Sequence, residues 1–139
     1  MRGVSVRRWS RIHALVYRLT GGLIGRRLVN NDMLLLATTG RASGERHTVP
    51  LLYLADGERL VVIASYGGRP NHPDWYQNLS QDPVVEVTVP GSTSMMRART
   101  ASSRERDLWW PRIVEAYHGY RTYQGRTDRE IPVVFLEPN

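Results

Sequence analysis

The sequence predicts a protein of the α+β class, mainly β, with a small barrel of about six mostly antiparallel strands. Two observations carry this prediction: short apolar runs of strand length recur along the chain, and turn residues separate them. A third is an absence, because no glycine-rich turn joins a strand to a helix as a dinucleotide-binding fold requires. The chain of 139 residues has the length of one such domain.

Tight turns separate the first three predicted strands, which are residues 33–38, 47–55 and 60–64. Pro50 lies inside the second strand and favours an edge or bulge position there, because proline has no N–H to donate to a neighbouring strand. Asp56-Gly57 is a strong hairpin signal between the second strand and the third. Two hairpins in succession predict an antiparallel meander.

Two predicted short helices interrupt the later strands. Pro73 can begin the first helix, which runs through Leu79, because proline is tolerated in the first turn. Ser102 and Glu105 have the spacing of a capping box and begin the second helix. Within it, Pro111 predicts a kink or a new first turn. The remaining strands are residues 85–89, 93–101 and 131–136, with a tyrosine-rich loop before the last of them.

Basic charge is concentrated at the N-terminus. The chain carries 19 Arg, no Lys and 13 acidic residues, a formal net charge of +6. Residues 1–31 contain seven Arg and no acid, whereas residues 32–139 contain 12 Arg and 13 acids and sum to −1. We therefore predict a basic amphipathic helical arm over residues 1–31 and a folded domain over residues 32–139. No nucleic-acid partner is expected, because the folded domain has no basic excess.

The arm has the pattern of an amphipathic helix when residues 9–19 are placed at helical spacing. Its apolar face consists of Trp9, Ile12, Leu15, Val16 and Leu19. This pattern favours peripheral contact of residues 7–27 with an anionic membrane, and docking on the folded domain is the alternative. No apolar run reaches the ~20 residues that span a bilayer, and no secretory signal is evident. We expect a cytoplasmic protein, peripheral on the inner face of the cell membrane where the arm binds lipid.

Few side chains suggest chemistry of their own. The sequence has no Cys, and its four His do not have metal-ligand spacing, so no metal site is predicted. The absence of Lys excludes Schiff-base catalysis. Asp128 and Glu130, on either side of Arg129, are interpreted as solvated loop charges.

Three segments indicate an anionic aromatic ligand. Residues 38–44 combine hydroxyls, glycines and Arg41, as in a nest of amides that binds an anion, with a plain hairpin connection as the alternative. Residues 64–68 place Ser65 before paired glycines, which let a flat ligand approach the backbone closely. The third segment repeats tyrosine at every third position and either lines a pocket or packs with nearby tryptophans: Tyr117, Tyr120 and Tyr123.

These segments resemble the deazaflavin-dependent nitroreductase family over about residues 10–138. The motifs that carry the resemblance are Thr38-Thr39-Gly40-Arg41 with Ser43-Gly44, Pro50-Leu51, Ala64-Ser65 with Gly67-Gly68, Pro73-x-Trp75-Tyr76-x-Asn78-Leu79, Tyr120-x-x-Tyr123-Gln124 and Thr127-Asp128-Arg129-x-Ile131-Pro132. The resemblance implies a split β-barrel that uses coenzyme F420, an 8-hydroxy-5-deazaflavin. It also implies hydride transfer to a quinone, a nitro-aromatic compound or a similar conjugated acceptor. Some members associate with membranes through an N-terminal amphipathic helix.

The resemblance also implies the site residues. Arg41 and Ser43 match positions that hold the coenzyme phosphate. Ser65 and Tyr120 are the predicted catalytic residues, hydrogen-bonding the oxyanion that develops on the acceptor. The full predicted coenzyme-binding set is Arg41, Ala42, Ser43, Gly44, His47, Thr48, Val49, Pro50, Leu51, Leu52, Ile63, Ala64, Ser65, Tyr66, Gly67, Trp75, Tyr76, Asn78 and Tyr120.

Three positions depart from the family pattern. Ala42, His47 and Tyr66 stand where members commonly have Lys, Arg and Lys. A charged hydrogen bond contributes roughly 1.5–3 kcal/mol, so each departure weakens coenzyme binding about tenfold or more. Two other functions therefore stay open. One is a split barrel that binds FMN or another ligand without deazaflavin turnover, and the other is a basic membrane- or nucleic-acid-binding module. The acceptor and the oligomeric state are not specified by the sequence.

Overall fold

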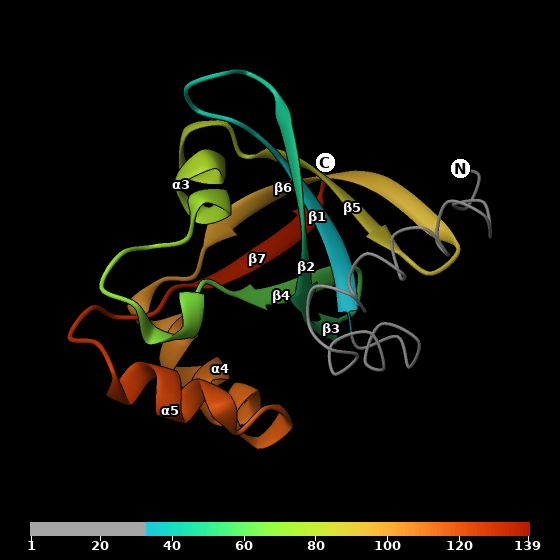
Figure 1. The fold of residues 1–139 in the computed structure, drawn as a ribbon. Helices are drawn as coiled ribbons and strands as arrows, with labels where there is room; N and C mark the ends of the chain where they lie inside the picture. Colours follow the sequence, from blue (N-terminus) through green and yellow to red (C-terminus); the bar gives the residue numbers. More distant parts are fainter. Residues whose placement is uncertain (1–32) are drawn as a thin grey trace.

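The computed structural model describes residues 33–139, so the predicted arm, including residues 7–27, lies outside the described residues. The described residues form one antiparallel sheet of seven strands in the order β2-β1-β5-β6-β7-β4-β3 (Figure 1). The strands are β1 (Met33–Thr39), β2 (Arg46–Leu52), β3 (Leu54–Asp56), β4 (Arg59–Ile63), β5 (Val84–Val89), β6 (Ser92–Thr100) and β7 (Val133–Pro138). The predicted mainly β fold is confirmed.

The sheet closes into a barrel through a single bent segment. β2 and β3 stand at opposite ends of the strand order, although only Tyr53 separates them in the sequence. Pro50 in β2 pairs with Leu35 in β1, whereas Ala55 in β3 pairs with Leu60 in β4. The prediction of one strand over residues 47–55 is therefore wrong. The chain bends at its middle because its two halves border different strands, as barrel closure requires.

Two apolar layers explain why β4 and β7 read as continuous apolar runs. Val62 and Val134 point into the barrel, while their neighbours Val61 and Val133 point outward to the helices. The inner layer also contains Leu34, Leu36, Val85, Val87 and Leu136. The outer layer also contains Ile63, Trp109, Ile113, Tyr120, Ile131 and Phe135. Strands buried on both faces lose the alternation of polar and apolar residues.

The described residues also form three α-helices, which lie outside the sheet: α3 (Asp74–Gln81), α4 (Ser103–Ala116) and α5 (Gly119–Gly125). Pro73 is the N-cap of α3. The predicted capping box of α4 is confirmed, since the Ser102 hydroxyl accepts from the Glu105 amide at 3.2 Å and the Glu105 carboxylate accepts from the Ser102 amide. The helix continues through Pro111.

The tyrosine-rich stretch is a helix, and the prediction of a loop there is wrong. α5 buries Tyr120, whose ring meets those of Tyr117 and Tyr123 edge-on at centroid distances of 6.1 and 6.0 Å. Tyr120 and Tyr123 lie three residues apart on one face of α5, whereas Tyr117 is the C-cap of α4. Their burial against the outer apolar layer outweighs the weak helix propensity of tyrosine and glycine.

Candidate functional site

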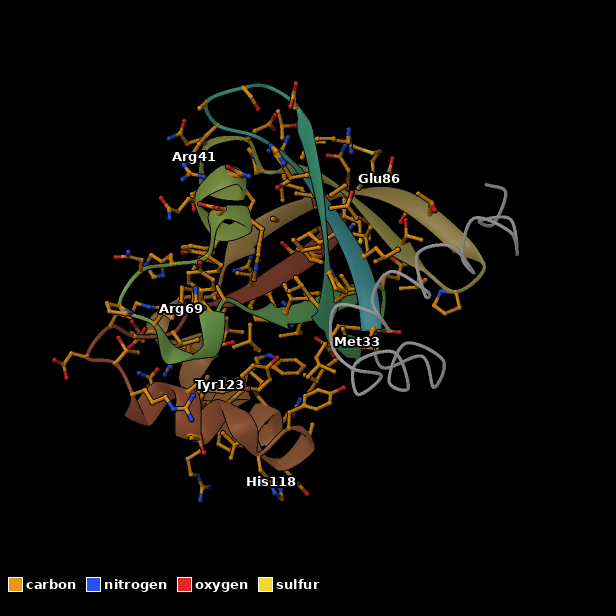
Figure 2. The ribbon with its side chains drawn as sticks, viewed as in Figure 1. Met33, Arg41, Arg69, Glu86, His118 and Tyr123 are labelled. Carbon is orange, nitrogen blue, oxygen red and sulfur yellow. The ribbon has the colours of Figure 1, made fainter. Side chains whose placement is uncertain are left out.

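Two clefts, each of about 630 Å³, share Val49, Asp74 and Trp75 and so form one groove along β2. Figure 2 shows Arg41 beside α3, with Arg69 and Tyr123 further along, toward α5. The basic cleft is lined by Thr38, Gly40, Arg41, Ala42, Ser43, Arg46, His47, Thr48, Val49, Asp74, Trp75 and Asn78. The apolar cleft is lined by Met33, Val49, Pro50, Leu51, Leu52, Ile63, Ser65, Tyr66, Gly67, Arg69, Pro73, Asp74, Trp75, Tyr120 and Tyr123.

A tight turn over residues 40–45 forms the end of the basic cleft. The Gly40 amide donates to the Glu45 carbonyl at 2.7 Å, and the Gly44 amide donates to the Gly40 carbonyl at 2.9 Å. A Cβ at Gly40 would lie 2.7 Å from the Ser43 hydroxyl oxygen and 2.9 Å from the His47 Nε2 atom. A side chain at position 40 would have to displace the ends of these two side chains, so glycine leaves room for a hydroxyl and an imidazole to converge over the turn.

Arg41 is fixed over the basic cleft by α3. Its Nη1 atom donates to Asn78 Oδ1 at 2.8 Å, and its Nη2 atom lies 3.1 Å from Asp74 Oδ1. Asn78 is buried, and its amide nitrogen donates to the Thr38 hydroxyl at 3.2 Å. The buried amide is thus satisfied on both sides and orients the guanidinium, while the Asp74 carboxylate offsets part of its charge.

The wall of the apolar cleft is the loop that follows β4. Tyr66 has a positive φ of 47° and begins the 3₁₀ helix η1 (Tyr66–Gly68), which packs on α5. Gly68 also has a positive φ, of 78°, and a Cβ there would collide with the backbone carbonyl of Tyr123. Ser65 lines this cleft and is only 9% exposed. Tyr120, 7% exposed, lines it from α5.

Arg129 crosses from the loop before β7 to the same wall. Its Nη2 atom donates to the Ser65 carbonyl at 2.7 Å and its Nη1 atom lies 3.0 Å from His72 Nδ1. Burial lowers the pKa of His72, and the adjacent positive charge of Arg129 lowers it further. Asp128 and Glu130 are exposed, as their interpretation as solvated loop charges requires, whereas Arg129 between them is half-buried.

Most predicted coenzyme-binding residues line the groove, but three side chains do not. Gly44 lies beyond the cleft in the exposed turn, and Ala64 is fully buried in the barrel. Ala64 points inward because neighbouring residues of an extended segment alternate between faces. The Tyr76 hydroxyl bonds the Thr100 hydroxyl at 2.8 Å, away from the groove face of α3 that carries Trp75 and Asn78.

The predicted coenzyme-binding set omits several residues that line the groove: Met33, Thr38, Gly40, Arg46, Arg69, Pro73, Asp74 and Tyr123. Thr38 and Gly40 belong to the quoted motif, and Arg46 directly precedes a predicted residue. Arg46 and Arg69 are the important omissions, because they bring positive charge to the two clefts that contain Ala42 and Tyr66. No local pattern indicates on which side of the loop the Arg69 guanidinium lies.

A family described as F420H(2)-dependent quinone reductase matches residues 9–138, nearly the whole chain and every segment of the groove. The chain belongs to this family. An F420H(2)-dependent quinone reductase of Mycobacterium tuberculosis is 38% identical over 130 residues, which are 91% of this chain and 87% of that protein. The family's cofactor is F420 and its members are oxidoreductases, so the predictions of cofactor and enzyme class are confirmed.

Solved structures give the same family and fold. An F420-H2 dependent reductase is 39% identical, with a TM-score of 0.70 over 76% of this chain and 94% of the other. A structure described as a domain-swapped dimer is 35% identical, with a TM-score of 0.72 over 96% of this chain and 100% of the other. The split-barrel fold expected for the F420H(2)-dependent quinone reductase family is therefore confirmed for this chain.

Residues 33–139 carry neither a metal-binding cluster nor a membrane-spanning helix. In that part of the chain, no group of three or more His, Asp or Glu side chains is arranged to hold a metal ion. None of the helices described there is long and apolar enough to cross a membrane.

Proposed function

We propose that this chain is a reductase that takes hydride from reduced F420 and delivers it to a quinone. One observation carries the proposal: in a chain of this family, a cleft lined by cations continues into a cleft lined by apolar and aromatic side chains. F420 has a flat ring at one end and a phosphate with an acidic tail at the other. The apolar cleft suits the ring, and the basic cleft suits the phosphate and acidic tail. The two clefts are continuous, so one groove can hold the whole coenzyme.

The donor set of the groove fits the coenzyme. Arg41, Arg46 and His47 bring positive charge or a titratable imidazole to the basic cleft, beside the Ser43 hydroxyl. These groups would hold the phosphate and acidic tail. Ala42 provides no charge, but Arg46 lines the same cleft, so the loss at position 42 is offset in part.

The apolar cleft would hold the deazaflavin ring and the acceptor. Pro50, Leu51 and Trp75 offer apolar surface against which a flat ring packs and from which water is excluded. When bound, F420 supplies the hydride, which is chemistry that no side chain of this protein offers. The protein's contribution is to hold the two reactants together in a dry site.

Ser65 and Tyr120 are assigned to the acceptor's oxygen. Ser65 lines the apolar cleft from the loop after β4, and Tyr120 lines the same cleft from α5. Each can donate a hydrogen bond to the negative charge that develops on a quinone oxygen as it is reduced. A nitro group develops negative charge on oxygen in the same way, so nitro-aromatic compounds are the second acceptor class.

A fluorescence titration tests the proposed cofactor. Purified protein is titrated with oxidised F420, and with FMN in parallel. Saturable quenching by F420 at micromolar concentration, with no saturable binding of FMN, is the expected result. Oxidation of reduced F420 is then followed with a soluble naphthoquinone and with a nitro-aromatic compound. Saturable FMN binding without F420 binding, or F420 binding without turnover of either acceptor, would refute the proposal.

Peripheral membrane contact through residues 7–27 is a further part of the proposal. Its support is the apolar face of residues 9–19 beside seven N-terminal Arg and no acidic residue. The full chain should sediment with anionic lipid vesicles and remain in solution with neutral ones. Replacing Arg7, Arg8 and Arg11 by Gln should weaken the sedimentation. Equal recovery with both vesicle types would contradict membrane contact driven by charge.

A further inference from the structure

We propose that Arg129 is a positioning residue for the reacting end of the groove. It holds the loop over residues 64–69 in the one conformation that presents Ser65 and Arg69 to the apolar cleft. The inference rests on the proposed function, because it assigns the loop a role in seating the deazaflavin ring and the acceptor. Arg129 does not line either cleft and acts through the loop.

Three contacts connect the Arg129 guanidinium to the loop, and a fourth reaches His72 beyond it. It donates from Nη2 to the Ser65 carbonyl at 2.7 Å and from Nη1 to the Ala64 carbonyl at 3.2 Å. Its Nε atom donates to the Arg69 carbonyl at 2.9 Å, and its Nη1 atom meets His72 Nδ1 at 3.0 Å. These acceptors lie at both ends of the loop. One planar cation therefore sets the distance between the end of β4 and the approach to α3.

The loop has a conformation that needs such support. Tyr66 has a φ of 47°, in a region that side chains other than glycine rarely occupy, and it is 43% exposed. A residue in that region persists only where its surroundings hold it. The Ser65 carbonyl accepts both from Arg129 and from the Gly68 amide, at 2.9 Å, so the guanidinium completes the turn that Tyr66 begins.

The backbone that carries Arg129 is itself fixed to the helices. The Gln124 side chain donates to the Arg129 carbonyl at 2.8 Å and accepts from the Ile131 amide at 2.9 Å. Arg106 on α4 donates to Gln124 Oε1 at 2.8 Å and to the Ile131 carbonyl at 2.9 Å. These hydrogen bonds hold the backbone at Arg129 in place. The fixed guanidinium in turn fixes the position of the loop that forms the cleft wall.

The test compares Arg129→Gln and Arg129→Lys with Arg121→Gln, which removes one exposed arginine charge from α5. Each variant is titrated with F420 and with the deazaflavin riboside that lacks phosphate and tail. Both Arg129 variants should raise the dissociation constants of the two ligands by the same factor, about tenfold, because the ring site is altered. The lysine variant should not restore the affinity for either ligand, since one ammonium group cannot reach acceptors at both ends of the loop. Arg121→Gln should match the wild type.

Turnover separates positioning from loss of stability. At saturating F420 and quinone, the Arg129 variants should have a kcat about tenfold lower while their midpoints of unfolding stay above the assay temperature. A lower kcat is expected because the Ser65 hydroxyl no longer faces the acceptor. Full rescue by lysine, or loss confined to the intact coenzyme, would overturn the inference.

A coenzyme-free measurement keeps this inference separate from the proposed function. Amide hydrogen exchange at Gly68 and Arg69 reports the bonds from their amides to the Ser65 and Tyr66 carbonyls. Exchange at these two amides should be at least tenfold faster in both Arg129 variants, with β1 unchanged. Unchanged exchange would overturn the positioning role even where the wild type binds F420. A wild type that binds neither ligand would overturn the role in ring binding together with the proposed function.

Discussion

The two ends of the groove are built by different means. The basic cleft is formed by one continuous stretch, residues 38–49, with α3 beside it. The wall of the apolar cleft is assembled from segments about 60 residues apart, since Arg129 holds Ser65 and the carbonyl of Tyr123 lies against Gly68. The binding end thus rests on one continuous stretch and one helix, whereas the wall of the reacting end is held by contacts between segments farther apart in the chain.

This difference indicates how each end responds to change. A Cβ at Gly44 in the basic turn would meet nothing within 4 Å, although its φ is positive at 73°. At Gly68, with a similar φ, a Cβ would meet backbone. Changes at the basic end should alter affinity by modest factors, while changes at the reacting end should alter both stability and turnover.

The largest effect is expected from Gly68→Ala. It adds left-handed strain and a clash with the Tyr123 carbonyl, which together should lower the free energy of unfolding by about 3 kcal/mol. Gly44→Ala is the matched control and should cost about 1 kcal/mol, because only the strain applies. Urea denaturation of both variants measures the difference. Equal losses of unfolding free energy in the two variants would show that the contact between Gly68 and Tyr123 does not constrain the reacting end.

Ser65→Ala should affect turnover and leave the fold intact. Loss of the donor to the developing oxyanion should lower kcat roughly hundredfold, with F420 affinity unchanged. Ser80→Ala on the exposed side of α3 is the control, since its hydroxyl bonds only the Tyr76 carbonyl among the described residues. Steady-state kinetics with a naphthoquinone gives the comparison. Full activity in Ser65→Ala and in Tyr120→Phe would remove both residues from the mechanism.

Two substitutions at the basic cleft should act in opposite directions. Arg41→Gln should raise the dissociation constant of F420 about tenfold, through loss of a charged hydrogen bond to the phosphate. Asp74→Asn should lower it roughly threefold, because the carboxylate 3.1 Å from Arg41 no longer competes with the ligand. Neither should change the affinity of the tail-less riboside. Tighter binding of F420 by the Arg41→Gln variant would show that the guanidinium only stabilises α3 and does not bind the phosphate.

The smallest effect concerns acid sensitivity at the reacting end. Folding holds the pKa of His72 below its ordinary value of 6.5, so the unfolded chain binds a proton that the folded chain excludes. The free energy of unfolding therefore has its full value above pH 6.5. It decreases as the pH falls below 6.5 and through the folded-state pKa of His72. His72→Gln should flatten this part of the profile of unfolding free energy against pH. A wild-type profile identical to that of the variant would contradict the assignment.

The same contrast explains what the sequence could predict. The strands predicted over residues 33–38 and 85–89 and the capping box at Ser102 are confirmed, because their signals lie in adjacent residues. Most residues of the basic cleft were expected from the resemblance to the deazaflavin-dependent nitroreductase family. Barrel closure at Tyr53 and the contacts of Arg129 with the loop after β4 were not predicted. Both depend on partners far away in the chain, which leave no periodic pattern in the sequence.

We propose that charged side chains bind the phosphate and acidic tail of F420 and that apolar side chains bind its ring. The most direct test is to titrate the wild type with F420 and with the tail-less riboside, at low and at high salt. Both ligands should bind, F420 should bind more tightly, and salt should weaken the binding of F420 alone, since salt screens its phosphate and acidic tail. No saturable binding of F420, or the same salt dependence for both ligands, would contradict it.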